Sequence, residues 1–269
     1  MSSAASAEVQ LHRLVEIIER LRQPNGCAWD REQTLSSLRP FLIEEAYEVL
    51  EEMDRAVASD VWGPLREELG DLLLQIVFQS QIAAEKGHFS IADVCQAIAD
   101  KLERRHPQVF ADAKAEKWAQ LKAQERKNKL GDEGSALDGV PAAAPALLQA
   151  ERLTEKASQV GFDWATLKQV REKLDEEIQE LDQAIASGER KEIEHELGDV
   201  LFTVVNLSRF LKTPPEDALR SANRRFSRRF RHVEQNLRRE GIPWGEATPQ
   251  QMEQRWEAAK REEGQKSER

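Results

Sequence analysis

Hydrophobic residues recur every three to four positions along most of the chain, which is the spacing of amphipathic helices. Four such stretches occupy the first part of the sequence, at residues 11–21, 41–54, 65–83 and 90–102. A Pro-Asn-Gly turn at residues 24–26 separates the first two. Gly87 is placed to end the third stretch, and Ser90 is placed to cap the fourth. The pattern predicts a compact four-helix unit that closes near residues 104–107.

The second half of the chain repeats this arrangement. The stretch from Lys173 to Ala186 echoes Phe41 to Asp54, and residues 193–211 echo 65–83. One more helix is predicted over residues 250–263. Repetition at this scale indicates a duplicated structural unit.

The repeat sets the expected domain organisation. We expect a helical domain at residues 1–110, a connector at 111–150 that contains glycine-rich and alanine-proline segments, and a second helical domain at 151–269. The composition is typical of a helical protein, because the chain is 33% charged with only 13 Gly, 10 Pro and a single Tyr. The predicted fold class is all-α, built from tandem four-helix units.

Charge and cysteine content narrow the possible partners. The net charge of −10 and the pI near 5.2 argue against direct nucleic-acid binding, which needs a basic surface. Two cysteines, Cys27 and Cys95, cannot build a disulfide framework or a zinc site by themselves. The first residues lack a signal-peptide pattern, and no apolar run approaches the roughly 18 residues of a membrane span. We therefore expect a cytoplasmic protein that does not enter membranes.

The acidic residues repeat in the same register as the helices. Three glutamates precede a Glu-Leu-Gly-Asp motif in each half, and the copies are Glu44, Glu45, Glu48, Glu68 and Asp71, then Glu176, Glu177, Glu180, Glu196 and Asp199. The first three positions recur at an offset of 132 residues and the last two at 128. Glycine inside a helix costs about 1 kcal/mol relative to alanine, so the repeated glycine indicates close helix packing.

The carboxylates of the second copy are spaced to meet. Residues three or four apart share a helix face, so Glu177 pairs with Glu180, and Glu196 pairs with Asp199. Two such helices packed antiparallel bring four carboxylates together, and a cation must offset their repulsion. Oxygen-only ligation suits Mg²⁺, with Mn²⁺ as a substitute. The competing interpretations are a solvated acidic face and a ferritin-like di-iron site, for which Glu192 and His195 supply only one of two required Glu-x-x-His steps.

A basic segment complements the acidic one. Seven arginines lie between Arg224 and Arg239, and Lys173 precedes Glu177 by one helical turn. Arginine forks bind phosphate oxygens in a bidentate manner, so metal-binding carboxylates and guanidinium groups together suit triphosphate binding. A solvated basic helix is the alternative for the arginines. Trp256 is placed either to stack on a base or to pack near the chain end.

These motifs resemble those of the MazG nucleoside triphosphate pyrophosphohydrolases. The resemblance rests on Glu-Glu-x-x-Glu followed by Glu-x-x-Asp, on residues 26–34 and on residues 104–110, and it extends over about residues 8 to 260. It implies an all-α homodimer that cleaves nucleoside triphosphates (NTPs) to a monophosphate and pyrophosphate with Mg²⁺. Broad activity on canonical and aberrant nucleotides, and a role in cleaning the nucleotide pool, are further implications.

The resemblance also assigns residues. It implies the metal ligands Glu177, Glu180, Glu196 and Asp199, with Glu45, Glu48, Glu68 and Asp71 as a possible second site. It implies the nucleotide contacts Lys173, Leu174, Asp175, Glu176, Glu177, Arg225, Phe226, Ser227, Arg228, Arg229 and Trp256. The attacking water is then oriented or deprotonated by Glu176 or Glu177, and Arg228 and Arg229 stabilise the departing pyrophosphate.

The two copies differ around their carboxylates. Phe41 stands at the position of Lys173, and Lys101 stands at that of Arg225. An apolar side chain cannot neutralise phosphate, so we expect the second domain to carry the activity and the first to be weak or structural. Two rival functions remain open: a narrower pyrophosphatase acting on dUTP or dCTP, and a catalytically silent nucleotide-binding assembly module.

Overall fold

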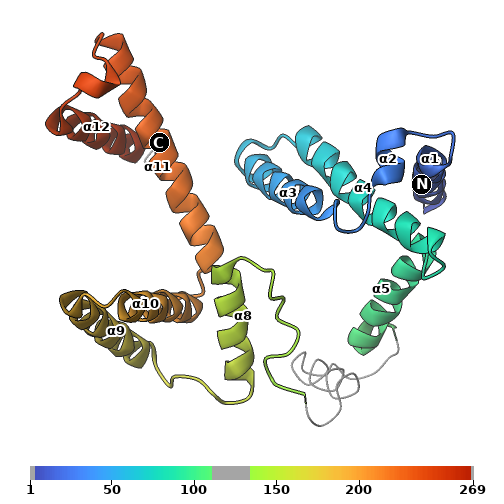
Figure 1. Ribbon diagram of the computed structural model, residues 1–269, viewed down its shortest axis with the longest axis horizontal. Helices are drawn as coiled ribbons and strands as arrows, with labels where there is room; N and C mark the ends of the chain where they lie inside the picture. The colour runs from blue at the N-terminus through green and yellow to red at the C-terminus, as the bar shows by residue number, and fades with distance from the viewer. Residues whose placement is uncertain (1–3, 111–133, 268–269) are drawn as a thin grey trace. The chain divides into compact units, whose positions relative to one another are not determined.

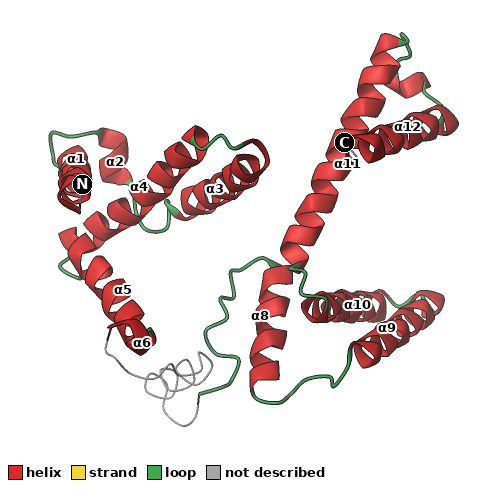
Figure 2. Ribbon diagram, turned by 180° about the vertical axis from the view of Figure 1, so that it is seen from behind, coloured by secondary structure: helices red, strands yellow, loops and turns green. Residues whose placement is uncertain are grey.

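Every regular element in the described part of the chain is a helix. The computed structural model describes residues 4–110 and 134–267 (Figures 1 and 2). The predicted all-α class is confirmed. The chain divides into two compact units, Met1–Leu121 and Lys122–Arg269. Residues 111–133 of the expected connector lie outside the described residues.

The first unit contains six described helices. They are α1 (Ala4–Arg22), α2 (Ala28–Glu32), α3 (Arg39–Ser59), α4 (Gly63–Glu85), α5 (Ile91–Arg105) and α6 (Pro107–Phe110). Proline stands in the first turn of α3 and of α4, where its missing N–H group costs nothing. The expected cap of α5 is present, because Ser90 and Asp93 form a capping box.

The core of the first unit lies where α1 crosses α4. Ile18 of α1 and Val77, Phe78 and Ile82 of α4 are almost inaccessible to solvent. A smaller cluster holds α3 against α4 further along. An ion pair closes the edge of the first cluster, since Arg22 Nε donates to Glu85 Oε1 at 2.7 Å. This hydrogen bond lowers the pKa of Glu85.

The second unit contains the repeated helix pair and an extension. Its helices are α8 (Ala146–Gln159), α9 (Leu167–Ser187), α10 (Arg190–Phe210), α11 (Pro215–Arg239), the short 3₁₀ helix η1 (Trp244–Glu246) and α12 (Pro249–Ser267). Helix α8 therefore begins inside the stretch that we expected to be connector. Its packing against α10 places it with the second unit.

Local sequence determines the hairpin of α9 and α10. Thr166 accepts a hydrogen bond from the Gln169 amide in a capping box at the start of α9. Gly188 ends the helix at φ 76°, a left-handed conformation that glycine adopts without strain. Helix α10 begins two residues later and packs along α9, while α11 leads away towards α12 (Figure 1).

Within the described residues, apolar side chains on the outer face of this hairpin are exposed to solvent. Ile178, Leu197 and Leu201 follow the spacing of core residues, yet each is at least two-fifths exposed. A two-helix hairpin covers only the face between its helices, so the opposite face needs another layer. Gly198 and Gly70 also lack the expected close neighbour, because an added Cβ meets no heavy atom within 4 Å in the described residues.

A helix must be both long and apolar to cross a membrane. Within residues 4–110 and 134–267, none of the helices is both long and apolar enough to cross a bilayer.

Candidate metal and nucleotide site

Three carboxylates of the second unit come together between α9 and α10. Glu177 and Glu180 lie one turn apart on α9, and Glu196 lies on α10. Each offers an oxygen atom, and these oxygens all lie within 4.8 Å of one another. Glu177 is only 6% exposed, so the group lies at the edge of the apolar interior. The predicted meeting of the two helix faces is present for these three residues.

Lys173 supplies positive charge to this group. Its Nζ atom lies 2.8 Å from Glu176 Oε1, 3.0 Å from Glu177 Oε1 and 3.9 Å from Glu180 Oε2. The hydrogen bond to Glu176, followed by that to Glu177, raises the pKa of the Lys173 ammonium group. The side chain therefore stays protonated and offsets part of the repulsion among the carboxylates.

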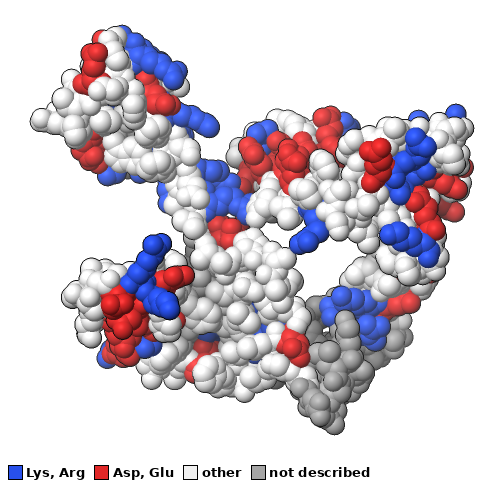
Figure 3. All heavy atoms as spheres, in the orientation of Figure 1, with Lys and Arg blue, Asp and Glu red and all other residues white. Residues whose placement is uncertain are grey.

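Desolvation still affects the carboxylates of this group. Burial raises the pKa of Glu180, the Lys173 charge acts in the opposite direction, and Glu177 and Glu176 raise it further. On the face shown in Figure 3, acidic side chains gather over α9 with basic ones beside them. The arrangement concentrates negative charge that one small cation would neutralise.

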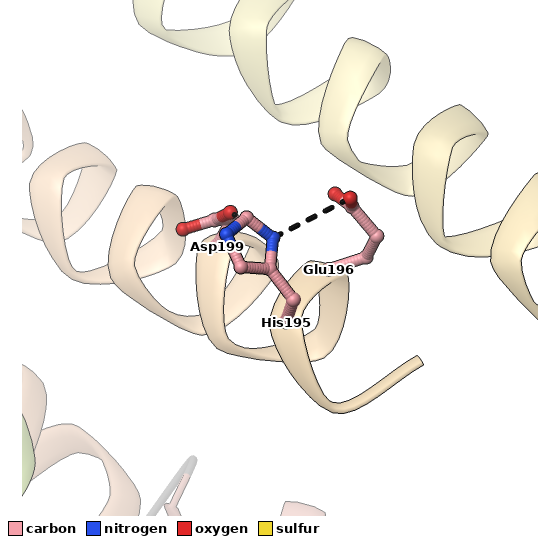
Figure 4. Close-up of side chains that lie close together, drawn as sticks. All are labelled: His195, Glu196 and Asp199. Atoms are coloured by element: carbon pink, nitrogen blue, oxygen red, sulfur yellow. Dashed lines mark ion pairs between the residues drawn. The ribbon is translucent and has the colours of Figure 1, made fainter. Parts of the chain in front are cut away.

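Asp199 lies in a neighbouring group and not in the group of three. Its Oδ2 atom is 3.1 Å from His195 Nδ1, and Glu196 Oε1 is 3.4 Å from the same nitrogen (Figure 4). Glu196 thus belongs to both groups. His195 therefore contacts two of the predicted metal ligands, and its position four residues before Asp199 was the signal in the sequence that these two share a helix face.

The first unit contains the matching group without the lysine. Oxygens of Glu45, Glu48 and Glu68 lie within 4.8 Å of one another. Burial raises the pKa of Glu45, and the charges of Asp71 and Glu48 raise it further. Desolvation also raises the pKa of Glu68, and the charges of Glu48 and Asp71 raise it further. Phe41, at the position of Lys173, packs against the apolar core of the unit and meets Trp29 edge-on at 5.9 Å.

The remaining residues of the Lys173–Glu177 segment separate by face. Leu174 is buried in the core of the unit, and Asp175 pairs with Arg171 at 3.0 Å. Only Lys173, Glu176 and Glu177 of this segment take part in the charged network.

The basic and aromatic residues form a second cluster, between α11 and α12. Phe226 lies 5.2 Å from the ring of Trp256, and the guanidinium of Arg229 lies 5.8 Å from the same ring. Arg225 donates a hydrogen bond to Ser221 at 2.8 Å. Ser227 is exposed to solvent. Of the predicted nucleotide-binding residues of α11, Phe226 and Arg229 therefore contact Trp256.

Glu263 occupies the two arginines of this cluster. Arg228 Nε donates to Glu263 Oε1 at 2.6 Å, and Arg229 Nε donates to Glu263 Oε2 at 2.9 Å. The carboxylate thus takes the place that two phosphate oxygens can take. Sequence reasoning missed Glu263. Its spacing of seven residues from Trp256, which places both on one face of α12, was the available signal.

The acidic and basic clusters stand on different parts of the second unit. Asp199 lies eleven residues before the end of α10, which is about 16 Å along that helix. Arg228 lies thirteen residues after Pro215, about 20 Å along α11. The two helices diverge from their junction (Figure 1), so the clusters lie apart within one chain.

Comparison with known proteins agrees with the repeated site. A model of the MazG nucleotide pyrophosphohydrolase domain matches residues 33–110 and 165–234, which together are more than half of the chain. Both carboxylate groups and Arg225–Arg229 fall within the matched segments, whereas Trp256 and Glu263 fall outside them.

Several curated proteins are similar to this chain, some over nearly its full length and others over about half of it. The chain is 45% identical over 264 residues to the nucleoside triphosphate pyrophosphohydrolase of Escherichia coli strain K12, covering 94% of this chain and 98% of that protein. It is 45% identical over 257 residues to the nucleoside triphosphate pyrophosphohydrolase/pyrophosphatase MazG of Thermotoga maritima, covering 94% and 97%. A nucleoside triphosphate pyrophosphohydrolase of Mycolicibacterium smegmatis is 40% identical over 156 residues, 55% of this chain. The chain therefore belongs to the MazG nucleotide pyrophosphohydrolase family and carries two copies of the family domain.

Proposed function

We propose that the protein is a Mg²⁺-dependent pyrophosphohydrolase that converts NTPs and their deoxy forms to monophosphates and pyrophosphate. The observation that carries this proposal is the group of Glu177, Glu180 and Glu196, closed by Lys173, within the second copy of the family domain. The nucleoside triphosphate pyrophosphohydrolases of Escherichia coli and Thermotoga maritima are similar to this chain over nearly the full length of each protein. We therefore assign the activity in their names to this protein.

The donor set suits a hard cation. Glu177, Glu180 and Glu196 offer only carboxylate oxygens, which Mg²⁺ prefers, and Asp199 is one turn from Glu196 as a fourth ligand. Mn²⁺ is the expected substitute. When bound, Mg²⁺ polarises phosphate oxygens and lowers the pKa of a coordinated water. Glu45, Glu48, Glu68 and Asp71 form the corresponding site that we propose in the first unit, where Phe41 leaves the phosphates without a lysine.

In this proposal, side chains of the protein accept the proton of the attacking water and balance the charge of the phosphates. We assign Glu176 or Glu177 to orient the attacking water and accept its proton. Burial and the bond to Lys173 hold Glu177 in place, while Glu176 is exposed to solvent and is held only by its hydrogen bond from Lys173 among the described residues. Lys173 then turns from the carboxylates towards a phosphate as the substrate enters.

The basic cluster is assigned to the rest of the nucleotide. Arg228 and Arg229 exchange the Glu263 carboxylate for pyrophosphate oxygens, because both anions accept two parallel hydrogen bonds from guanidinium groups. Trp256 and Phe226 offer ring faces to the base. Stacking contacts tolerate every base, which supports broad specificity and a role in clearing unwanted nucleotides from the cytoplasmic pool.

A second copy of the chain completes the site in this proposal. The exposed apolar face of α9 and α10 needs a covering layer, and the two clusters lie apart in one chain. We propose a homodimer in which α11 and α12 of one copy approach the carboxylates of the other. Mixing inactive Arg229→Ala with inactive Glu196→Gln then restores part of the activity. A mixture as inactive as its components would refute this shared arrangement.

The test of the function is NTP hydrolysis with Mg²⁺ present or chelated, with pyrophosphate resolved from orthophosphate. Glu196→Gln and Glu68→Gln are a matched pair, since the two residues hold the same position in the two copies. We expect Mg²⁺-dependent pyrophosphate release that Glu196→Gln abolishes and Glu68→Gln largely preserves.

Other outcomes have distinct meanings. Loss with Glu68→Gln alone would move the activity to the first unit. A strict preference for dUTP or dCTP would identify a narrow pyrophosphatase. No pyrophosphate from any NTP would contradict the enzyme proposal and favour a silent binding module.

A further inference from the structure

Four aromatic rings form a continuous row across the second unit. The row runs from Trp256 of α12 over Phe226 and Phe230 of α11 to Trp244 of η1. The centroids of neighbouring rings are 5.2, 6.0 and 5.0 Å apart in that order, and the planes of the two phenylalanine rings differ by only 16°. The proposed nucleotide contacts use the first two of these rings, so Phe230 and Trp244 have no role in them.

Most of this row is open to solvent. Phe226, Phe230 and Trp244 are each more than one third exposed. Other side chains hold α11 in place, since Val233 and Leu237 are almost inaccessible to solvent. The three exposed rings therefore offer flat apolar area to a ligand, and every nucleobase has a flat face that stacks on such a ring.

Arginines lie on both sides of the row. Residues 220–231 contain six arginines and no acidic residue. Arg225 and Arg229 each precede a phenylalanine of the row by one position, and Arg231 follows Phe230. Successive residues of a helix are about 100° apart around its axis, so these arginines flank the rings. Aromatic rings beside basic side chains are the combination that binds single-stranded nucleic acid.

The spacing of the rings fits successive bases. Adjacent bases of a stacked strand are about 3.4 Å apart, so rings 5.0 to 6.0 Å apart match the bases of a partly extended strand. The net charge of −10 disfavours long nucleic acids. The ligand that fits both observations is a short single strand, of which one end enters the nucleotide site.

We propose that the protein also removes pyrophosphate from the 5′-triphosphate end of short single-stranded oligonucleotides. The first base stacks on Trp256 and Phe226, as in a free NTP, and the next two bases stack on Phe230 and Trp244. The inference rests on the proposed function, because the triphosphate enters the same site.

The reaction is the one proposed for NTPs. Water attacks the α-phosphorus, its proton passes to Glu176 or Glu177, and the bond between the α- and β-phosphates breaks. Pyrophosphate leaves, and the strand keeps a 5′-monophosphate. An oligonucleotide differs from a free NTP at the 3′ oxygen, which carries the next nucleotide and takes no part in the bond that breaks.

The experiment compares pyrophosphate release from ATP and from a triadenylate with a 5′-triphosphate, both with Mg²⁺ and the full-length protein. The variants are Trp244→Ala and the control Trp62→Ala, at an exposed tryptophan of the first unit. We expect Trp244→Ala to raise the KM for the triadenylate by about fivefold or more, as for one lost stacking contact, with kcat unchanged. Both variants should keep the wild-type kinetics with ATP, which also shows that they are folded.

A second variant separates stacking from packing. Phe230→Leu keeps an apolar side chain on α11 and removes the ring, so the KM for the triadenylate should rise again. Light scattering on Trp244→Ala gives its mass, which should equal that of the wild type. A lower mass would show that a second copy of the chain covers the row, and would overturn the inference.

The remaining outcomes separate the two proposals. Hydrolysis of ATP without hydrolysis of the triadenylate would overturn the inference and leave the proposed function in place. A KM for the triadenylate that is the same in Trp244→Ala, Phe230→Leu and Trp62→Ala would also overturn it. No pyrophosphate from either substrate would contradict the proposed function and the inference together.

Discussion

The Lys173 ammonium group lies 3.0 Å from the buried carboxylate of Glu177, one turn along α9. In the first unit the position of Lys173 is taken by Phe41, which packs into the core. The two copies of the domain therefore hold similar carboxylate groups with different charge balance.

Lys173→Met should reduce the kcat/KM for NTP hydrolysis by roughly tenfold to a hundredfold, as expected for loss of a hydrogen bond between charged groups. It removes the cation that we assign to the phosphates and leaves Glu177 without its partner. Steady-state kinetics with Mg²⁺ measure the effect. Lys168→Met is the control, because Lys168 lies on the same helix and, in the part of the chain that the structure describes, forms its ion pair with the exposed Glu172. Equal effects of the two substitutions would remove Lys173 from the site.

Glu263→Gln should tighten the binding of pyrophosphate. Arg228 and Arg229 are both held by this carboxylate, and exposed ion pairs contribute at most about 1 kcal/mol, so a gain of up to about fivefold is expected. Calorimetric titration with pyrophosphate measures it, and the neighbouring Glu262→Gln should show no gain. Weaker binding in Glu263→Gln would mean that Glu263 organises the arginines for the ligand.

Glu45→Gln should stabilise the protein in the absence of metal. Burial and neighbouring carboxylates raise the pKa of Glu45, so its ionised form destabilises the fold at neutral pH. We expect the Tm in a chelating buffer to rise by about 1–2 °C, and the stabilisation by added Mg²⁺ to shrink. Thermal unfolding with and without Mg²⁺ provides both values, with Glu44→Gln as control. An unchanged response to Mg²⁺ would argue against a metal position in the first unit.

Leu201→Lys should convert the proposed dimer to monomers. Leu201 is 52% exposed on the uncovered face of α9 and α10, where a charge cannot be buried without large cost. Light scattering coupled to size exclusion gives the mass, and Val9→Lys, at a similarly exposed apolar residue of α1 in the first unit, should leave it unchanged. A wild-type protein that is monomeric at micromolar concentration would contradict the dimer.

The Arg22–Glu85 pair should give a defined pH dependence of stability. Arg22 lowers the pKa of Glu85 below its ordinary value of 4.5. A lowered carboxyl pKa contributes stability that is fully present above the unfolded-state pKa and is lost as the pH falls through the folded-state pKa. The difference in Tm between wild type and Glu85→Gln should therefore be constant above about pH 5.5 and shrink in acid. A difference that persists at pH 3 would refute this assignment.

Spacing along the chain was enough to identify the duplicated helix pairs α3–α4 and α9–α10 and their carboxylate pairs, whereas α8 begins inside the stretch expected to be connector and α11 was not predicted. Glu177 and Glu180 share a face of α9 because residues three apart lie about one turn apart, and this holds wherever the helix packs. The sequence also showed that Phe41 stands in the first copy at the position that Lys173 holds in the second. These features depend on local geometry, which the order of residues determines.

Which faces meet was decided by tertiary packing. Glu196 joins Glu177 and Glu180, while Asp199, on the same face of α10, lies against His195. Ile178 and Leu201 have the pattern of core residues and are nevertheless exposed, because burial depends on a covering layer and periodicity shows only which side is apolar. Glu263 of α12 accepts hydrogen bonds from Arg228 and Arg229 of α11. Contacts of this kind depend on how helices distant in sequence are placed, and local periodicity carries no information about that placement.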